Sequence, residues 1–183
     1  MALIFPDNTV LINFAYCDEM DLLGKIVAGR GTWTASVASE CADKASDLDL
    51  PALAASHTIF GEPLLPDRVE HIQTRIHREH FLKPGDGPKK HLGESETLAI
   101  IENRLFEGTT IFVTDDGSVP TRAKACNIAV ACITTWDLVR FGVKSGRMDA
   151  GAAMSMRATL MELDRVHMSH VRDREAFTAW LRE

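Results

Sequence analysis

Long hydrophobic runs are missing from this chain of 183 residues. No stretch approaches the roughly 18 apolar residues that a membrane-spanning helix needs. The first residues, Met1–Pro6, have neither the basic start nor the long apolar centre of a secretory leader. We therefore expect a soluble, cytoplasmic protein with no membrane partner.

Cysteine and positive charge are also scarce. The four cysteines form no CxxC pair and stand among apolar or small residues, which favours reduced core thiols over a disulfide framework or a zinc site. Only 20 Lys and Arg residues face 26 Asp and Glu residues, and the net charge is −6. This balance argues against binding of nucleic acid through bulk positive charge. A phosphate-bearing substrate must then meet a metal ion or a local basic patch.

The sequence does contain a repeated change between strand-like and helix-like segments. Apolar runs that suit strands occur at residues 2–5, 33–35, 110–114 and 128–133. Helical patterns occupy residues 8–17, 36–46, 66–81, 94–106, 118–126, 135–142 and 149–182, the last with a break near Ser169. Such alternation is typical of an α/β fold with a parallel sheet covered by helices. The composition, 45% hydrophobic and 25% charged, suits one compact domain.

One segment, residues 68–90, is basic in the otherwise acidic chain. Its Lys, Arg and His residues are Arg68, His71, Arg75, His77, Arg78, His80, Lys83, Lys89 and Lys90. The segment could contact an RNA backbone, or it could be an ordinary solvated helix face. Its histidines do not predict zinc, because no carboxylate or cysteine completes a recognisable ligand spacing.

Acids follow two of the expected strands. Asp7 comes directly after the first apolar run, which places it at the carboxyl end of a strand, where open α/β sheets form their sites. The alternative is an N-cap for the helix that begins near Asn8. Asp115 and Asp116 come directly after the run Thr110–Thr114. Adjacent acids bring like charges together, which costs stability unless a cation offsets it.

Two further acids belong to predicted helices. Glu94 shares one stripe with three apolar residues that the helix must bury, Leu98, Ile101 and Leu105. A buried carboxylate usually has a metal ion, a basic partner or a raised pKa. Glu96 lies on the opposite face, where we expect exposure to solvent. Glu40 lies among small residues that suit close packing, although a surface position is the alternative.

Acids from four separate segments could therefore converge at one end of the sheet. The candidate ligands of this all-oxygen site are Asp7, Glu40, Glu94, Asp116 and Asp115. Hard carboxylate ligands favour Mg²⁺ or Mn²⁺ over metals that prefer softer ligands.

The order and spacing of these segments resemble the acidic motifs of the PIN-domain family, which includes VapC-like toxin ribonucleases. The matching segments are Asp7–Ile12, Thr34–Glu40, His91–Ile100 and Thr114–Asp116. The third is similar to a variant in which Glu replaces the commoner Asp. In the fourth, Asp116 aligns better than Asp115. The resemblance covers about residues 3–142.

This resemblance implies a three-layer α/β/α sandwich over residues 1–142, with residues 143–183 as a helical extension packed on the same domain. It implies metal-dependent cleavage of single-stranded RNA, a homodimer and, for a toxin, an antitoxin partner. The catalytic residues would be Asp7, Glu40, Glu94 and Asp116. In this interpretation they bind one or two Mg²⁺ or Mn²⁺ ions, which activate water and neutralise charge on the phosphate.

Two other interpretations compete with a nuclease. Asp7 could be the nucleophile of a haloacid-dehalogenase-like phosphatase, but that family has an acid two residues later, where this chain has Thr9. The chain could instead be a catalytically inactive PIN-like binding or scaffold protein. The presence of all four acids argues against such a loss of activity.

Overall fold

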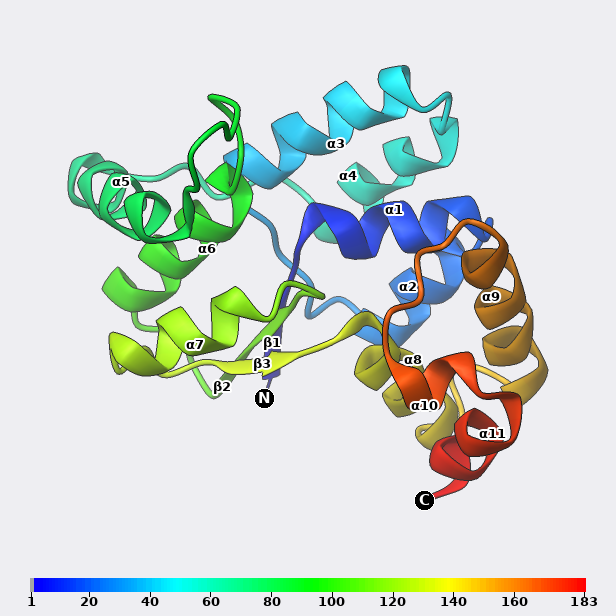
Figure 1. The fold of residues 1–183 in the computed structure, drawn as a ribbon. Coiled ribbons are helices and arrows are strands. Elements are labelled where there is room, and N and C mark those ends of the chain that lie inside the picture. Colours follow the sequence, from blue (N-terminus) through cyan, green and yellow to red (C-terminus); the bar gives the residue numbers. More distant parts are fainter. Residues whose placement is uncertain (1) are drawn as a thin grey trace.

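Three short parallel strands form the centre of the computed structural model, which describes residues 2–183. The strands are β1 (Ala2–Pro6), β2 (Thr109–Val113) and β3 (Ala131–Ile133). Ile4 pairs with Ile111, and Val113 pairs with Ile133, which places β2 in the middle of the sheet (Figure 1). The predicted α/β class with a parallel sheet is confirmed, although β3 is shorter than its apolar run.

The strand predicted at residues 33–35 is wrong. Thr34 forms only an isolated parallel bridge to Leu64, and Gly31 forms one to Ile4. This part of the chain follows the edge of β1 through two backbone hydrogen bonds, from Ile4 N to Arg30 O (2.8 Å) and from Thr32 N to Ile4 O (2.9 Å). A helix then begins at residue 35 and leaves too little extended chain for a strand.

Helices make up most of the remaining structure of residues 2–183. They are α1 (Asn8–Tyr16), α2 (Met20–Val27), α3 (Ala35–Asp47), a 3-10 turn (Pro51–Ala54), α4 (Ala55–Phe60), α5 (Arg68–Phe81), α6 (Leu92–Asn103), α7 (Ser118–Ala125), α8 (Thr135–Lys144), α9 (Ala150–Glu162), α10 (Ser169–Arg172) and α11 (Arg174–Arg182). The predicted helical segments are present with ends that differ by a few residues. Helices α2 and α4 and the 3-10 turn were not predicted from the sequence.

Local capping explains where several helices begin. Asp67 and Glu70 form a capping box at the start of α5, because each side chain accepts a hydrogen bond from the other's backbone N–H (2.9 and 2.7 Å). Thr134 and Asp137 form the same arrangement at the start of α8. Helices α3 and α6 have no such side-chain cap of their own. Instead, a carboxylate of each helix accepts a hydrogen bond from a backbone N–H in the first turn of the other helix, at the site described below.

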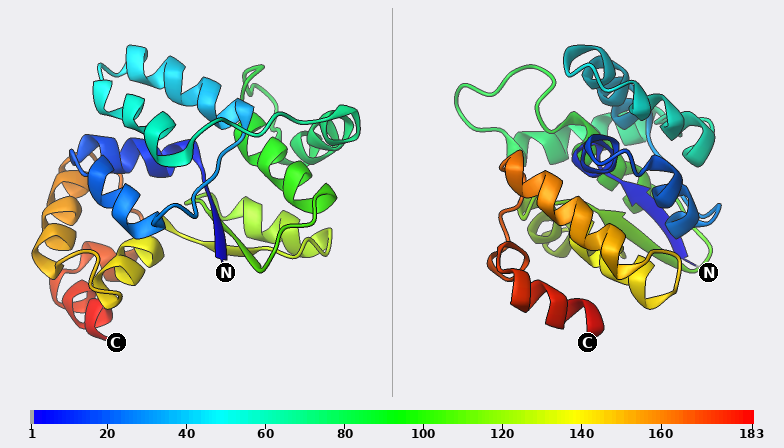
Figure 2. Two further views of the ribbon diagram at one scale, coloured as in Figure 1. Left: turned by 180° about the vertical axis from the view of Figure 1, so that it is seen from behind. Right: turned by 90° about the vertical axis from the view of Figure 1, so that its right-hand side faces the viewer.

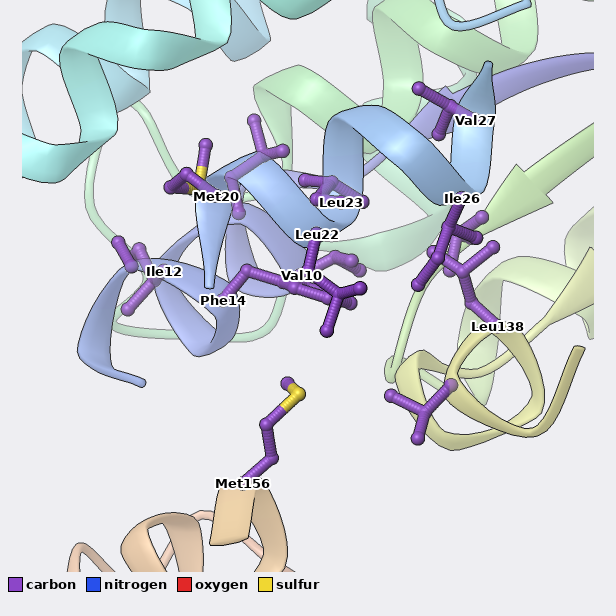
Figure 3. Packing of buried hydrophobic residues seen from close by; sticks show 14 of the residues in the cluster. Val10, Ile12, Phe14, Met20, Leu22, Leu23, Ile26, Val27, Leu138 and Met156 are labelled. Atoms are coloured by element: carbon purple, nitrogen blue, oxygen red, sulfur yellow. The ribbon is translucent and has the colours of Figure 1, made fainter. Parts of the chain in front are cut away.

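Side chains from the two faces of the sheet enter two different hydrophobic clusters. Ile4 and Val113 pack with α1, α2, α3, α8 and the C-terminal helices, and Figure 3 shows part of this cluster. Phe5 and Phe112, the neighbours of these residues in the chain, pack with α5, α6 and α7 on the other side. Successive strand residues point to opposite faces, so helices cover both. This arrangement is compatible with a three-layer α/β/α sandwich.

The C-terminal helices pack on the same core as the first helix. Helix α9 contacts α1, and α11 contacts α8, as the two views of Figure 2 show. Met156 of α9 and Phe177 of α11 are fully buried in the first cluster. The expected interruption lies at residues 163–168, and α10 and α11 follow it. No helix among residues 2–183 has both the length and the apolar character of a membrane-spanning segment.

Candidate metal centre

Asp7 stands at the junction between β1 and α1. Its backbone N–H donates to Val113 O (2.8 Å), which continues the pairing of β1 with β2. Its carboxylate accepts a hydrogen bond from Asn8 N (2.8 Å), so Asp7 is also the N-cap of α1, as the alternative interpretation expected. Asp7 is only 4% exposed, yet it lines a pocket at the surface of the described chain. The capping role and the strand-end position therefore coexist.

This pocket has a volume of about 610 Å³. Three of the predicted site residues, Asp7, Glu40 and Glu94, line it together. The remaining lining residues form its rim and walls: Asn8, Thr9, Asp43, Lys44, Asp47, Gly87, Pro88, Lys89, Lys90 and His91. The structure thus places acids from the β1–α1 junction, α3 and α6 around one space.

Glu40 and Glu96 fix the relative position of α3 and α6. Glu40 accepts a hydrogen bond from Gly93 N in the first turn of α6 (3.0 Å), and Glu96 accepts one from Ser36 N in the first turn of α3 (2.7 Å). Each carboxylate therefore satisfies an orphan N–H at the start of the other helix. The helices approach closely because Gly93 has no side chain, since a Cβ there would lie 3.0 Å from Glu40 Oε2 and 3.1 Å from Val37 Cγ2.

The expectation that Glu96 is exposed to solvent is wrong. Its side chain is 4% exposed and points toward α3. Leu105 also departs from the predicted buried stripe, because α6 ends at Asn103 and Leu105 is fully exposed. A single buried stripe was the wrong assumption for α6, which lies between α3 and α5 and is buried over most of its surface.

Glu94 and Asp116 meet through a histidine. His91 Nδ1 lies 3.3 Å from Glu94 Oε1 and 3.6 Å from Asp116 Oδ2. One ligand atom from each of the three residues lies within 4.8 Å of the other two. The side chains are 12%, 13% and 31% exposed for His91, Glu94 and Asp116, so ligand atoms are sheltered but reachable. This group could hold a metal ion.

Asp115 points away from this group, although it is the neighbour of Asp116. Its carboxylate accepts hydrogen bonds from Thr135 N (2.9 Å), Thr135 Oγ1 (2.7 Å) and Asn13 Nδ2 (3.2 Å). These bonds connect the end of β2 to the start of α8 and to α1. Of the two adjacent acids, Asp116 faces the candidate metal centre and Asp115 lines a separate, smaller pocket.

The acids differ in how easily they ionise. Burial, together with the charges of Glu94 and Glu40, raises the pKa of Asp7 well above its usual value. Burial and the charge of Glu94 raise the pKa of Glu40 to about 7, although the hydrogen bond from Gly93 opposes this. Burial also disfavours ionisation of Asp116, but two hydrogen bonds from Ser118 and the charges of His91 and Lys90 together outweigh it and lower the pKa of its carboxyl. Asp7 and Glu40 therefore lack compensating positive charge.

The basic segment divides into residues with different roles. Lys89 and Lys90 line the pocket, and Lys89 Nζ forms an ion pair with Asp43 Oδ2 across it (2.5 Å). Arg78 holds the loop that carries them, because its guanidinium donates to the backbone oxygens of Gly87, Pro88 and Lys90. His77 is fully buried between helices and cannot meet a substrate.

His91 is the site residue that the sequence analysis did not single out. It precedes Gly93 and Glu94 within the third acidic motif, which is the one sequence signal for it. Its position depends on a left-handed backbone conformation (φ 59°) that the motif does not reveal. Such a conformation is uncommon for a residue other than glycine.

Comparisons with known proteins leave the site to be interpreted from its own chemistry. A scan against protein-family models, a search of curated proteins and a search of solved structures each found no significant match to this chain. This outcome neither supports nor contradicts the resemblance to PIN domains.

Proposed function

We propose that this chain is a Mg²⁺- or Mn²⁺-dependent endoribonuclease of the PIN type, which hydrolyses phosphodiester bonds in single-stranded RNA. The observation that carries the proposal is the convergence of Asp7, Glu40 and Glu94 in one pocket, with Asp116 joined to Glu94 through His91. These acids come from four segments that are distant in the sequence. Their convergence is what a metal centre of this type requires.

The donor set suits a hard divalent cation. Carboxylate oxygens are preferred ligands of Mg²⁺ and Mn²⁺. No Lys or Arg of the described chain forms an ion pair with any of the four acids, and the raised pKa values of Asp7 and Glu40 reflect this. When bound, the ion lowers the pKa of a water molecule and neutralises charge that develops on the phosphate.

The rest of the pocket suits a phosphate-bearing strand. Lys44, Lys89 and Lys90 line it and are the positive charges that a phosphate could meet there. Lys44 is paired with Asp47 and Lys89 with Asp43, so a phosphate would replace these carboxylates. Arg78 fixes the loop that carries Lys89 and Lys90 by donating to its backbone oxygens. The backbone of these lysines is therefore held in position before a substrate binds. We infer that they contact phosphates on either side of the bond that is cut.

Cleavage of a labelled single-stranded RNA in Mn²⁺ and in EDTA tests the proposal. We expect metal-dependent cleavage by the native chain and a loss of at least about 100-fold in Asp7→Asn, more than the 10- to 100-fold typical of residues that only support a ligand. Asn caps a helix as well as Asp, so the fold should survive. Asp21→Asn, an exposed acid of α2, is the matched control and should cleave normally. Equal cleavage by Asp7→Asn would contradict the proposal.

The resemblance to PIN domains implies two partners, a second copy of the chain and an antitoxin, and both remain predictions. A homodimer is checked by light scattering of the purified chain over a range of concentrations. An antitoxin is checked by co-expression with a small protein encoded beside this chain, which should suppress the RNA cleavage. The metal centre of the proposal requires neither, because all of its acids come from one chain.

A further inference from the structure

The backbone at His91 has an uncommon conformation. His91 is the N-cap of α6 with a positive φ of 59°, and its side chain does not cap that helix. The residue before it, Lys90, is fixed through its backbone oxygen by Arg78 Nε (2.8 Å). Residues other than glycine that keep such a conformation often lie at functional sites, where the surrounding structure maintains the strain. The position of the His91 imidazole therefore suggests a role at the site.

The imidazole ring is oriented toward the acids. The ring of Phe81 packs against it with the two centroids 5.5 Å apart. Its Nδ1 atom points to Glu94 Oε1 and Asp116 Oδ2, at 3.3 and 3.6 Å. Asp116 Oδ1 is occupied by the hydrogen bonds from Ser118, which leaves Oδ2 free to face the histidine. Three donor atoms from three residues thus surround one small space, and one of them is a nitrogen.

We propose that His91 is a metal ligand through Nδ1 and that it makes this centre prefer Mn²⁺ over Mg²⁺. Mg²⁺ strongly favours oxygen ligands, whereas imidazole suits transition metals, and affinity for mixed nitrogen and oxygen sites rises along the first-row series. A centre of four carboxylates alone would lack this bias. The inference rests on the proposed function only in requiring a divalent cation at these acids, not in requiring RNA as the substrate.

The direct test is spectroscopic and uses the native chain. Electron spin echo measurements on bound Mn²⁺ detect a nitrogen nucleus that is coordinated to the metal. We expect such a coupling in the native protein and its absence in His91→Asn. Asn tolerates the left-handed backbone better than most residues, so this variant keeps the start of α6. His80→Asn, an exposed histidine of α5, is the matched control and should keep the coupling.

Metal affinities give the second readout. Calorimetric titration should show that His91→Asn weakens Mn²⁺ binding by about 10-fold or more and Mg²⁺ binding by about 3-fold or less, so that the preference for Mn²⁺ falls. Equal loss for both metals, or no nitrogen coupling in the native chain, would overturn the role of His91 and leave the nuclease proposal standing. Nitrogen coupling without any RNA cleavage would support the role of His91 and contradict the nuclease. If the native chain binds neither metal, both proposals are wrong.

Discussion

Two regions of the molecule gather charged side chains around at least one buried acid, and the two regions differ in whether the acids have basic partners. The first is a brace between α5, α6 and α7, made of Glu70, His77, Glu102, Arg104 and Arg122. Both oxygens of Glu70 accept hydrogen bonds from Arg104 (2.7 and 2.7 Å). Arg122 Nε donates to His77 Nδ1 (3.0 Å), so His77 Nε2 carries its proton and donates to Glu102 (2.9 Å). Every acid of the brace has a donor.

The second region is the acid cluster of the pocket, made of Asp7, Glu40, Glu94 and Asp116. No Lys or Arg of the described chain forms an ion pair with these acids, although Lys89 and Lys90 line the same pocket. His91 lies beside Glu94 and Asp116 and is a cation only if its ring is protonated. The hydrogen bonds of Arg104 lower the pKa of Glu70, whereas burial raises the pKa of Glu40 to about 7. The difference supports the proposal that the acid cluster binds a cation, whereas each acid of the brace already has a donor within the chain.

Removing one acid from each region should give the sharpest contrast. Glu70→Ala leaves Arg104 without its partner and removes the half of the capping box in which Glu70 accepts from Asp67 N, so we expect a loss of about 3 kcal/mol in the free energy of unfolding, at the low end for buried pairs because Arg104 is partly exposed. Glu94→Ala removes a repulsive charge and should change the stability of the metal-free protein by about 0.5 kcal/mol or less. Urea unfolding of both variants in EDTA measures this. A similar loss in both variants would remove the distinction between the regions.

The pH dependence of stability is the next largest effect. Folded Glu40 keeps its proton up to a pKa of about 7, whereas the unfolded chain releases it near 4.5. The folded state binds more protons between these values, so this contribution is fully present below pH 4.5 and is lost as the pH rises to about 7. At 1.36 kcal/mol per pH unit the 2.5-unit difference sets an upper limit of about 3.4 kcal/mol for this loss.

Glu40→Gln isolates this effect in the metal-free protein. The amide oxygen can still accept the hydrogen bond from Gly93, but it does not titrate. His77 acts in the opposite direction, because burial lowers its pKa and stability then falls as the pH drops below 6.5. The quantity to compare is therefore the difference between native chain and variant in urea unfolding from pH 4 to 8. If that difference does not change with pH, Glu40 is not an uncompensated acid.

Adding a divalent cation should remove much of the contrast between the two regions. Mn²⁺ at 100 times its dissociation constant should add about 2.7 kcal/mol to the stability of the native state, if the unfolded chain does not bind it. The gain should be larger at pH 7.5 than at pH 5, because the ligands must lose their protons to bind. Thermal melts of the native chain and Asp7→Asn measure it. Equal gains in both would show that Mn²⁺ binds elsewhere.

The acids that follow β1 and β2 could be predicted as site residues from the sequence, because the pattern that reveals them lies within a few neighbouring residues. Asp7 and Asp116 follow apolar runs, and a parallel sheet brings the carboxyl ends of its strands to one edge. The same runs predicted β1 and β2 nearly to the residue. The site therefore could be placed at that edge of the sheet before the structure was known.

The remaining parts of the site depend on contacts that local pattern does not encode. Glu96 was placed in solvent because a helical wheel assumes one buried face, while α6 has neighbours on several sides. His91 depends on a backbone conformation set by a distant residue, Arg78. Helix α2 was missed because it is short, contains Gly24 and has no side-chain cap. Its apolar residues are buried against the rest of the core, which stabilises a segment of weak propensity.

Glu96 offers a smaller but informative effect. Its hydrogen bond to Ser36 N holds the first turn of α3, so Glu96→Ala should cost about 1 to 2 kcal/mol of stability. Because the side chain faces α3, Mn²⁺ affinity should change little, whereas Glu94→Gln should reduce that affinity strongly. Urea unfolding and Mn²⁺ titration of both variants separate the two acids of the third motif. A strong loss of Mn²⁺ affinity in Glu96→Ala, with retained stability, would exchange their roles.

The smallest expected effect on stability compares the two adjacent acids Asp115 and Asp116. Asp115 resembles the acids of the brace, because Thr135 and Asn13 supply three donors to its carboxylate, whereas Asp116 faces His91 with one free oxygen. Asp115→Asn keeps an acceptor for Thr135 N and should lose only about 1 kcal/mol of stability, with Mn²⁺ binding unchanged. Asp116→Asn should keep its stability and weaken Mn²⁺ binding. Measuring both quantities in both variants decides the assignment, since weaker Mn²⁺ binding in Asp115→Asn alone would move the metal centre to the other side of the strand end.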